Sequence, residues 1–330
     1  MRTLTRKEFE DMKKKVEPIR KLAMHDDADG ISSAVLLSYI FKIEKVWCPK
    51  DFGEWSLTPS TNEDGSLELV PDFCVDMVPA NPKWSYTCID HHNHPPKEQR
   101  SYDLIWGEVP TGLMIYDLFK AQLPEEQKWK CVVSAVGDVA TEMIPPEIWR
   151  NNPSLLEETV STYERYGKLE TSRFPVYLRL TSGLNALCKM PDKWAIAYQT
   201  LRNAKTPIDL INDITLKNAR QYLADEKARL YREFSPLQLR NGITFFDFQS
   251  KTKLERTLAW ELWEKDLKTV IAINNTTKRG SIRGVLATLV YEHLSSKGFK
   301  CSGHPGAGGI RLKPDQDSRD VYKALIELRI

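Results

Sequence analysis

The stretch Met24-His25-Asp26-Asp27-Ala28-Asp29-Gly30 places one histidine and three carboxylates in a single turn. The apolar residues 22–24 before it are typical of the end of a buried strand, and residues 31–37 after it are typical of a helix start. The turn therefore lies where a strand passes into a helix, at the sheet edge where α/β folds bind ligands. Carboxylates this close repel one another, so we expect a divalent cation among them.

An acidic turn can also cap a helix or bind calcium. Asp29 could be the N-cap of the helix, where the helix dipole favours acids, but a cap uses only one acid of three. A calcium loop of the EF-hand type needs an acid at its first position and a glutamate at its twelfth. Counting from His25, the twelfth residue is Leu36, so the sequence excludes an EF-hand.

The composition indicates a soluble globular protein. The chain has 330 residues, of which 41% are hydrophobic and 28% charged, and it has no apolar run of membrane-spanning length. Its start shows no signal-peptide core and its six cysteines show no Cys-x-x-Cys spacing, so we expect a cytoplasmic protein with reduced cysteines. The net charge of +2 does not favour non-specific wrapping of long nucleic acid, although it permits a local basic patch.

Three later clusters repeat the pattern of acids or histidines at the end of an element. With the runs before them, they are Asp76 after residues 67–75, Asp90-His91-His92 after residues 84–89, and Gly137-Asp138 after residues 125–136. Short β-rich runs alternate with helices along this part of the chain, which predicts a mostly parallel α/β sheet. Clusters at element ends can form one shared site.

Together the clusters offer oxygen and imidazole ligands without sulfur, which suits Mn²⁺ or Mg²⁺ better than structural zinc. The candidate ligands are His25, Asp27, Asp29, Asp76, Asp90, His91 and Asp138. These groups exceed the needs of one metal. A pair of ions about 3.5–4 Å apart would use them, one activating a water and both holding a phosphoryl group.

These motifs resemble the four motifs of the DHH phosphoesterase family. The matching residues are His25-x-Asp27-x-Asp29-Gly30, Asp76, Asp90-His91-His92 and Gly137-Asp138. Further along, substrate-binding motifs of the associated DHHA1 domain are matched by Ser281-x-Arg283 and by Gly303-His304 with Ala307-Gly308-Gly309. All six motifs occur in the order of the family.

The resemblance implies an α/β fold in two domains with a cleft between them. We expect a mostly parallel sheet flanked by helices in the DHH domain, residues 1–205. A helical connector over residues 206–234 would lead to a smaller α/β DHHA1 domain, residues 235–330. Most of residues 153–234 is expected to be helical, and Asn241-Gly242 predicts a hairpin turn.

The resemblance also implies a role for each matching residue. His25, Asp27 and Asp76 would hold one Mn²⁺, and Asp29, Asp76, His91 and Asp138 the other, with Asp76 as the bridge. Asp90 would orient a neighbouring histidine, and His92 would face the phosphate or the leaving group. In the second domain Arg283 would bind phosphate, Ser281 would add a donor, and Gly303, His304 and Gly308 would let the substrate approach the backbone.

Simpler roles are expected for residues beside these motifs. His94 is expected to face solvent, Asp26 to face solvent or cap the helix, and Lys278 and Arg279 to form a solvated basic face. Thr111-Gly112, at a helix start, could contact phosphate, but capping explains this pair equally well.

The implied activity is that of a Mn²⁺-dependent phosphodiesterase or exonuclease, with Mg²⁺ as an alternative cofactor. Its substrates would be short single-stranded RNA or DNA or small nucleotides, cyclic ones included, and its products nucleoside monophosphates. No membrane partner is expected, and a homodimer is compatible with the sequence. One glycine precedes His304 where the family has two, which leaves the substrate preference open.

Two other functions are compatible with the same motifs. A pyrophosphatase or polyphosphatase would use the same metals, but it predicts a C-terminal cleft rich in Lys and Arg and poor in aromatic residues. A catalytically inactive scaffold associated with nucleic acid would keep the fold without the metals, which the complete ligand set argues against.

Overall fold

The computed structural model describes residues 3–49, 73–78, 86–165, 168–239, 241–266 and 268–328. The expected strand over residues 67–75 therefore lies partly outside the described residues, and only its end can be compared. The chain divides into two compact units. Unit 1 comprises Met1–Cys188 and Asp192–Arg220, and unit 2 comprises Lys189–Pro191 and Gln221–Ile330.

Unit 1 is built on a five-stranded sheet with the order β2-β1-β3-β4-β5, in which every neighbouring pair is parallel. The strands are β1 Ile19–Met24, β2 Ile43–Trp47, β3 Phe73–Val75, β4 Thr87–Asp90 and β5 Asp103–Trp106. The predicted parallel sheet is confirmed. Because β1, β3 and β4 are adjacent and parallel, the residues after all three emerge at one edge of the sheet.

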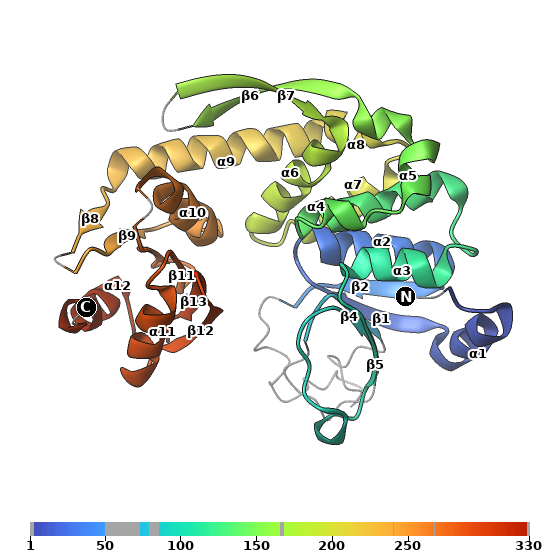
Figure 1. The fold of residues 1–330 in the computed structure, drawn as a ribbon, viewed down its shortest axis with the longest axis horizontal. Helices are drawn as coiled ribbons and strands as arrows, with labels where there is room; N and C mark the ends of the chain where they lie inside the picture. The colour runs from blue at the N-terminus through green and yellow to red at the C-terminus, as the bar shows by residue number, and fades with distance from the viewer. Residues whose placement is uncertain are drawn as a thin grey trace, which may run out of the picture. The chain divides into compact units, whose positions relative to one another are not determined.

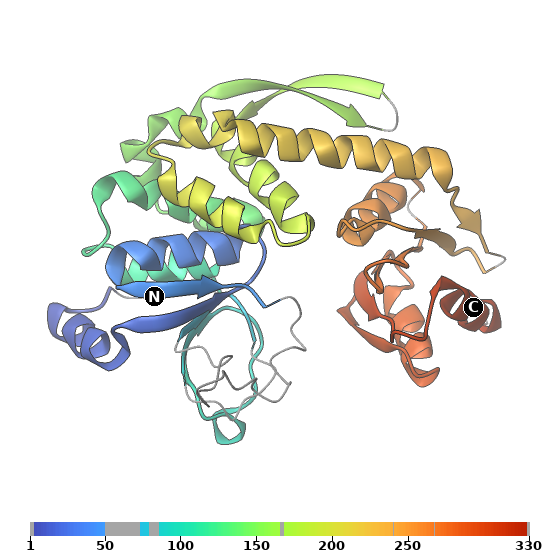
Figure 2. The ribbon, with the colours of Figure 1, turned by 180° about the vertical axis from the view of Figure 1, so that it is seen from behind.

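Helices flank this sheet, as Figure 1 shows and as Figure 2 shows from behind. Those before the division at Arg220 are α1 Arg6–Val16, α2 Ala28–Ile40, α3 Thr111–Phe119, α4 Cys131–Gly137, α5 Pro146–Asn151, α6 Val176–Lys189, α7 Trp194–Asn203 and α8 Pro207–Asn212. Helix α2 packs against α3, α4 and α7 and is buried along most of its length. A helix covered on several sides is apolar all round, which fits its sequence.

Short 3₁₀ helices interrupt the connections of unit 1. They are η2 Lys97–Gln99, η3 Glu125–Lys130, η4 Thr141–Met143 and η5 Pro153–Leu156. Helix α9, Ile214–Glu233, passes through the division between the units at Arg220.

A long antiparallel hairpin stands where the sequence predicted helix. Its strands are β6 Glu158–Arg165 and β7 Lys168–Pro175, paired from Glu158↔Pro175 to Arg165↔Lys168. The two strands include the β-branched residues Thr159, Val160 and Thr171, which favour a strand over a helix. The prediction that most of residues 153–234 is helical is confirmed by α6 to α9, whereas residues 158–175 form this hairpin instead.

Unit 2 contains a mixed six-stranded sheet with the order β12-β13-β11-β10-β9-β8. The strands are β8 Leu237–Gln238, β9 Thr244–Phe248, β10 Val270–Asn274, β11 Arg279–Arg283, β12 Lys300–His304 and β13 Ala307–Arg311. Strands β8 and β9 pair antiparallel, and Gly242 between them has φ +77°, which confirms the predicted hairpin. The helices of this unit are α10 Glu255–Asp266, α11 Ala287–Ser296 and α12 Ser318–Glu327.

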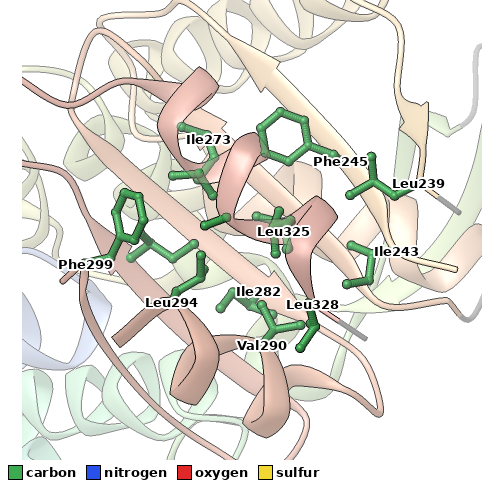
Figure 3. Packing of buried hydrophobic residues seen from close by; sticks show 14 of the residues in the cluster. Leu239, Ile243, Phe245, Ile273, Ile282, Val290, Leu294, Phe299, Leu325 and Leu328 are labelled. Carbon is green, nitrogen blue, oxygen red and sulfur yellow. The ribbon is translucent and has the colours of Figure 1, made fainter. Parts of the chain in front are cut away.

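Two hydrophobic cores lie on opposite faces of the unit 2 sheet. On one face, helices α11 and α12 cover Ile271, Ile273 and Ile282 (Figure 3). On the other face, α10 covers strands β9 and β10 through a cluster that includes Leu258, Val270 and Ala272, together with Phe246, Phe248 and Leu262. Strands β11, β13 and β12 extend beyond this second core.

The cysteines of the chain are free thiols, as expected, and five of the six are buried. Cys74 and Cys88 face each other on β3 and β4, with their Sγ atoms 3.7 Å apart. Among the described residues, no helix combines the length and the hydropathy that a membrane crossing requires.

Candidate metal centre

The acids and histidines of unit 1 gather at the carboxyl edge of the parallel sheet. The turn after β1 supplies His25, Asp27 and Asp29, and Asp76 follows β3 directly. Residues 90–92 come from the end of β4, and Asp138 is the C-cap of α4. The structure thus brings all the predicted metal ligands of unit 1 together.

The first group consists of His25, Asp27 and Asp76. His25 Nδ1 lies 2.7 Å from Asp27 Oδ2 and 3.5 Å from Asp76 Oδ2. One potential ligand atom from each of the three residues lies within 4.8 Å of the other two. This spacing is compatible with one cation bound between them.

The second group consists of Asp29, His91 and Asp138. One potential ligand atom from each of these residues also lies within 4.8 Å of the other two. His91 Nε2 lies 3.7 Å from Asp29 Oδ2 and 3.2 Å from Asp138 Oδ2. It also lies 3.2 Å from Asp76 Oδ1. Asp76 therefore directs one carboxylate oxygen to each group, which is the position that a bridging ligand needs.

The turn after β1 has a defined conformation. Asp27, not Asp29, is the N-cap of α2, because its Oδ1 accepts a hydrogen bond of 3.0 Å from Gly30 N. A Cβ at Gly30 would lie 2.4 Å from the backbone oxygen of His25, so this position requires glycine. Asp26 borders the group, with Oδ1 3.9 Å from His25 Nε2, and it does not cap the helix.

Asp29 is buried and held by the start of helix α3. Its Oδ2 accepts a hydrogen bond from Thr111 N (2.8 Å), and its Oδ1 accepts bonds from Gly112 N (2.9 Å) and Ser33 Oγ (3.1 Å). Thr111 Oγ1 also donates to Asp76 Oδ1 at 3.3 Å. The free amides of this helix start therefore bind a carboxylate of the protein, and neither phosphate binding nor simple capping describes them.

The carboxylates are crowded enough to change their acidity. Burial, followed by the charges of Asp29 and Asp27, raises the pKa of Asp76 well above its usual value. Burial and the Asp29 charge raise the pKa of Asp138 to about 7. Burial opposes ionisation of His25, yet the adjacent Asp27 carboxylate raises the pKa of this histidine. Without a counter-charge, this cluster holds extra protons at neutral pH.

The donor set fits divalent cations on geometric grounds as well. Asp76 Oδ2 and Asp138 Oδ2 are buried, and neither accepts a hydrogen bond from the described residues. Buried carboxylate oxygens without such partners are unfavourable unless a proton or a cation compensates them. Asp76 also has φ +55°, a left-handed conformation that is uncommon for aspartate and typical of functional sites.

Asp90 connects two histidines on the far side of the centre. Its Oδ1 lies 2.7 Å from His92 Nδ1 and accepts a bond of 2.8 Å from His91 N, while its Oδ2 lies 2.8 Å from His94 Nε2. Burial would raise the pKa of Asp90, but the bonds from His92 and His94 hold it below its usual value. Asp90 is therefore an ionised carboxylate that orients His92.

The expectation that His94 faces solvent is wrong. Its side chain is only 2% exposed, and its Nδ1 lies 2.6 Å from the hydroxyl of Tyr102. Tyr102 in turn stacks on Tyr86, with ring centroids 4.7 Å apart. Sequence reasoning missed this chain of contacts because it joins residues 90, 94 and 102 through a loop. The available signal was a histidine four residues after a buried aspartate.

The predicted substrate-binding residues lie together in unit 2. Ser281 and Arg283 are on β11, and the paired strands β12 and β13 place Gly303 opposite Gly308 and His304 opposite Ala307. A Cβ at Gly303 would lie 2.3 Å from Ala307 O, so the two strands approach closely there. Burial, followed by the charge of Arg256, lowers the pKa of Arg283.

Similarity to known proteins is detectable in structure. No protein-family model matches the sequence, and no curated protein does. RecJ from Thermus thermophilus in complex with Mn²⁺ has a TM-score of 0.61 at 15% identity, and the match covers 96% of this chain and 53% of RecJ. This chain thus spans about half the length of that protein.

Two further solved structures match most of both chains. A DHH domain from a member of the s1p family of ribosomal proteins has a TM-score of 0.56 at 12% identity, covering 94% of this chain and 87% of the domain. A pGpG-specific phosphodiesterase from Vibrio cholerae has a TM-score of 0.50 at 15% identity, covering 93% and 98%. The chain has the DHH-type fold, with a parallel sheet flanked by helices and a second, mixed sheet.

Proposed function

We propose that this protein is a metal-dependent phosphoesterase that hydrolyses short single-stranded nucleic acids or small nucleotides, cyclic ones included. The position of Asp76 is the observation that carries the proposal. Its two oxygens face two separate groups of ligands, His25 with Asp27 and His91 with Asp138. The neighbours of similar fold, a RecJ in complex with Mn²⁺ and a pGpG-specific phosphodiesterase, support the same chemistry.

The residues of unit 1 suit a pair of Mn²⁺ ions, or Mg²⁺ as the alternative. His25, Asp27 and Asp76 would hold one, and Asp29, Asp76, His91 and Asp138 the other. Such ions supply an activated water and stabilise the charge that builds up on the phosphoryl group. The amides of Thr111 and Gly112 fix the orientation of the Asp29 carboxylate.

His92 is suited to transfer a proton to the leaving oxygen. Its Nδ1 is held by Asp90, so Nε2 is the atom left for the substrate. Burial opposes protonation of His92, but Asp90 outweighs it and raises the pKa of the imidazole. A protonated His92 would donate from Nε2, and Asp90 would stabilise the positive charge.

In unit 2, Ser281 and Arg283 would bind a phosphate of the substrate. Gly303, Gly308 and His304 belong to the paired strands β12 and β13, and β13 pairs with β11, so these residues would contribute to the same substrate site. Pyrophosphate or polyphosphate hydrolysis is the second candidate function, because it requires the same metal ligands.

A substrate panel with Mn²⁺ tests the proposal. Dinucleotides, longer RNA and DNA oligomers, cyclic dinucleotides and pyrophosphate are incubated separately with the protein, and products are followed by chromatography. We expect nucleoside monophosphates from at least one nucleic-acid substrate and no product from Asp76→Ala. Phosphate release from pyrophosphate alone would establish the second candidate, and full activity of Asp76→Ala would overturn the metal mechanism.

A further inference from the structure

Strand β5 ends in a tryptophan beside the metal centre. Trp106 is the last residue of β5, and it pairs with Asp90, the last residue of β4. Paired residues of adjacent parallel strands lie side by side on one face of the sheet. The indole is therefore the lateral neighbour of the carboxylate that binds the imidazole of His92.

The contacts along β5 agree with this face. Tyr102, Leu104 and Trp106 follow one another at intervals of two residues, so their side chains point to the same side of the sheet. Tyr102 stacks on Tyr86, and both lie in one buried cluster with Cys88 of β4. Leu104 packs against the same cluster. This row of side chains leads to the carboxyl edge of the sheet, where α/β folds bind ligands.

The ring of Trp106 is fixed but not covered. Its Nε1 donates a hydrogen bond of 3.0 Å to the backbone oxygen of His92. The N–H is the only polar group of an indole, so the rest of the ring is an apolar surface. Trp106 is nevertheless 46% exposed. A ring that is already held by a hydrogen bond loses little further side-chain entropy when a flat ligand packs on it.

Two partly exposed rings are thus linked at the rim of the centre. The imidazole of His92 is 41% exposed, and its Nδ1 lies 3.8 Å from Asp76 Oδ1, so it borders the metal ligands directly. The indole of Trp106 is bound to the backbone of the same histidine. A phosphate held at Asp76 would have the imidazole beside it and the indole one step further out. In a nucleotide the base stands at the corresponding place, beyond the phosphate and the sugar.

We propose that the Trp106 indole stacks on the nucleobase of the nucleotide whose phosphate is bound at the metal centre. Every base has a π-face, so an aromatic side chain binds bases without selecting among them. This inference rests on the proposed function and deepens it, because it assigns a base next to the reacting phosphate to the substrate. Pyrophosphate and polyphosphate have no base, so the ring favours nucleotides and short nucleic acids over them.

A pair of ligands with and without a base tests the inference in the absence of any reaction. Adenosine 5′-phosphate and ribose 5-phosphate carry the same sugar phosphate, but only the first has a base. Each is titrated into the full chain with Mn²⁺ and followed by isothermal calorimetry. The unaltered protein should bind adenosine 5′-phosphate roughly tenfold more tightly, because only this ligand can stack. Trp106→Ala should remove the difference and leave the affinity for ribose 5-phosphate unchanged.

Two further variants separate stacking from support of the loop. Trp106→Phe keeps an aromatic ring but loses the hydrogen bond to His92, so it should retain most of the preference for adenosine 5′-phosphate. A tryptophan that only positioned His92 would give a different result, because Trp106→Phe and Trp106→Ala would then weaken both ligands alike. Trp260 on α10 is similarly exposed, at 51%, so Trp260→Ala is a matched control that should change neither affinity.

The outcome is independent of hydrolysis. Binding of neither ligand, equal binding of both, or a preference that survives in Trp106→Ala would overturn the inference. A preference that is lost in Trp106→Ala, without turnover of any substrate in the panel, would leave the inference intact and remove the proposed activity. Mn²⁺-dependent turnover with an unchanged preference in Trp106→Ala would do the reverse.

Discussion

The metal centre of unit 1 and a basic face of the unit 2 sheet handle charge in opposite ways. The basic residues of this face are Arg279, Arg283, Lys300 and Arg311, on strands β11, β12 and β13. In unit 1, Asp29, Asp76 and Asp90 are buried, and most of their oxygens are held by amides, hydroxyls or imidazoles of the protein. In unit 2, Lys300 is exposed, and like charges stand opposite one another on a sheet. A buried, oriented cluster suits chemistry on one phosphoryl group, whereas an open basic face suits binding of a chain of phosphates. Substitutions in the two regions should therefore change different kinetic constants.

Asp76→Asn should have the largest effect of all. The substitution weakens a ligand that both groups share. Because each bound ion would stabilise the charged transition state by several kcal/mol, kcat should fall ~10³-fold or more. The measurement is a steady-state assay with Mn²⁺ on the best substrate of the panel. Asp26→Asn, beside the cluster but without a predicted ligand role, is the control and should retain most activity.

His94→Ala should lower kcat by about 10–100-fold, the usual cost of losing a group that orients an active residue. Asp90 would lose one of its two imidazole partners, and His92 would be less well fixed. KM should stay nearly unchanged, because His94 is buried away from the substrate. Tyr102→Phe removes only the hydroxyl at 2.6 Å from His94 and should cost a few-fold at most. A variant at His94 with normal kcat would show that the contact chain is structural only.

Arg283→Ala should act mainly on KM, by about tenfold, in contrast to the unit 1 variants. The guanidinium would bind a phosphate away from the reacting atoms, so its loss removes binding energy common to substrate and transition state. Arg283→Lys should recover only part of the affinity, because an ammonium cannot form the bidentate contact. If kcat falls and KM does not rise, Arg283 contributes to the chemical step instead.

The pH dependence of stability should show the smallest effect, and only in metal-free protein. The pKa of Asp138 is raised to about 7, so the folded state binds a proton that the unfolded state has released. Its contribution to stability is present at low pH and is lost as the pH rises through about 7. The Tm in EDTA should therefore fall between pH 5 and 8, and Asp138→Asn should flatten that change. Mn²⁺ should raise the Tm most at the upper end of the range. An equal pH dependence in Asp138→Asn would assign the effect to other groups.

Much of the centre could be predicted from sequence because its residues follow strands. Apolar runs locate the strands, and adjacent parallel strands bring their ends together, so His25, Asp76 and His91 were expected at one edge. The pattern did not reveal how Asp29 is held. That depends on the amides of Thr111 and Gly112, which are 82 and 83 residues away in sequence.

Loops and exposed hairpins were harder to predict. His94 follows a polar turn, and its contacts with Asp90 and Tyr102 in the folded chain are not evident from that local sequence. The hairpin of β6 and β7 lacks a clear apolar repeat, so the helical segments on both sides dominated the prediction. In unit 2, sequence placed Arg279 on a solvated basic face, but the row with Arg311 and Lys300 depends on strand register.

Metal stoichiometry tests the central claim most directly. Metal-free protein is titrated with Mn²⁺ and followed by isothermal calorimetry, with electron paramagnetic resonance to detect coupling between neighbouring ions. We predict two Mn²⁺ per chain with a spin-coupled spectrum, and loss of the coupled signal in Asp76→Asn. Binding of no Mn²⁺, or two uncoupled ions that are unaffected by Asp76→Asn, would contradict the account.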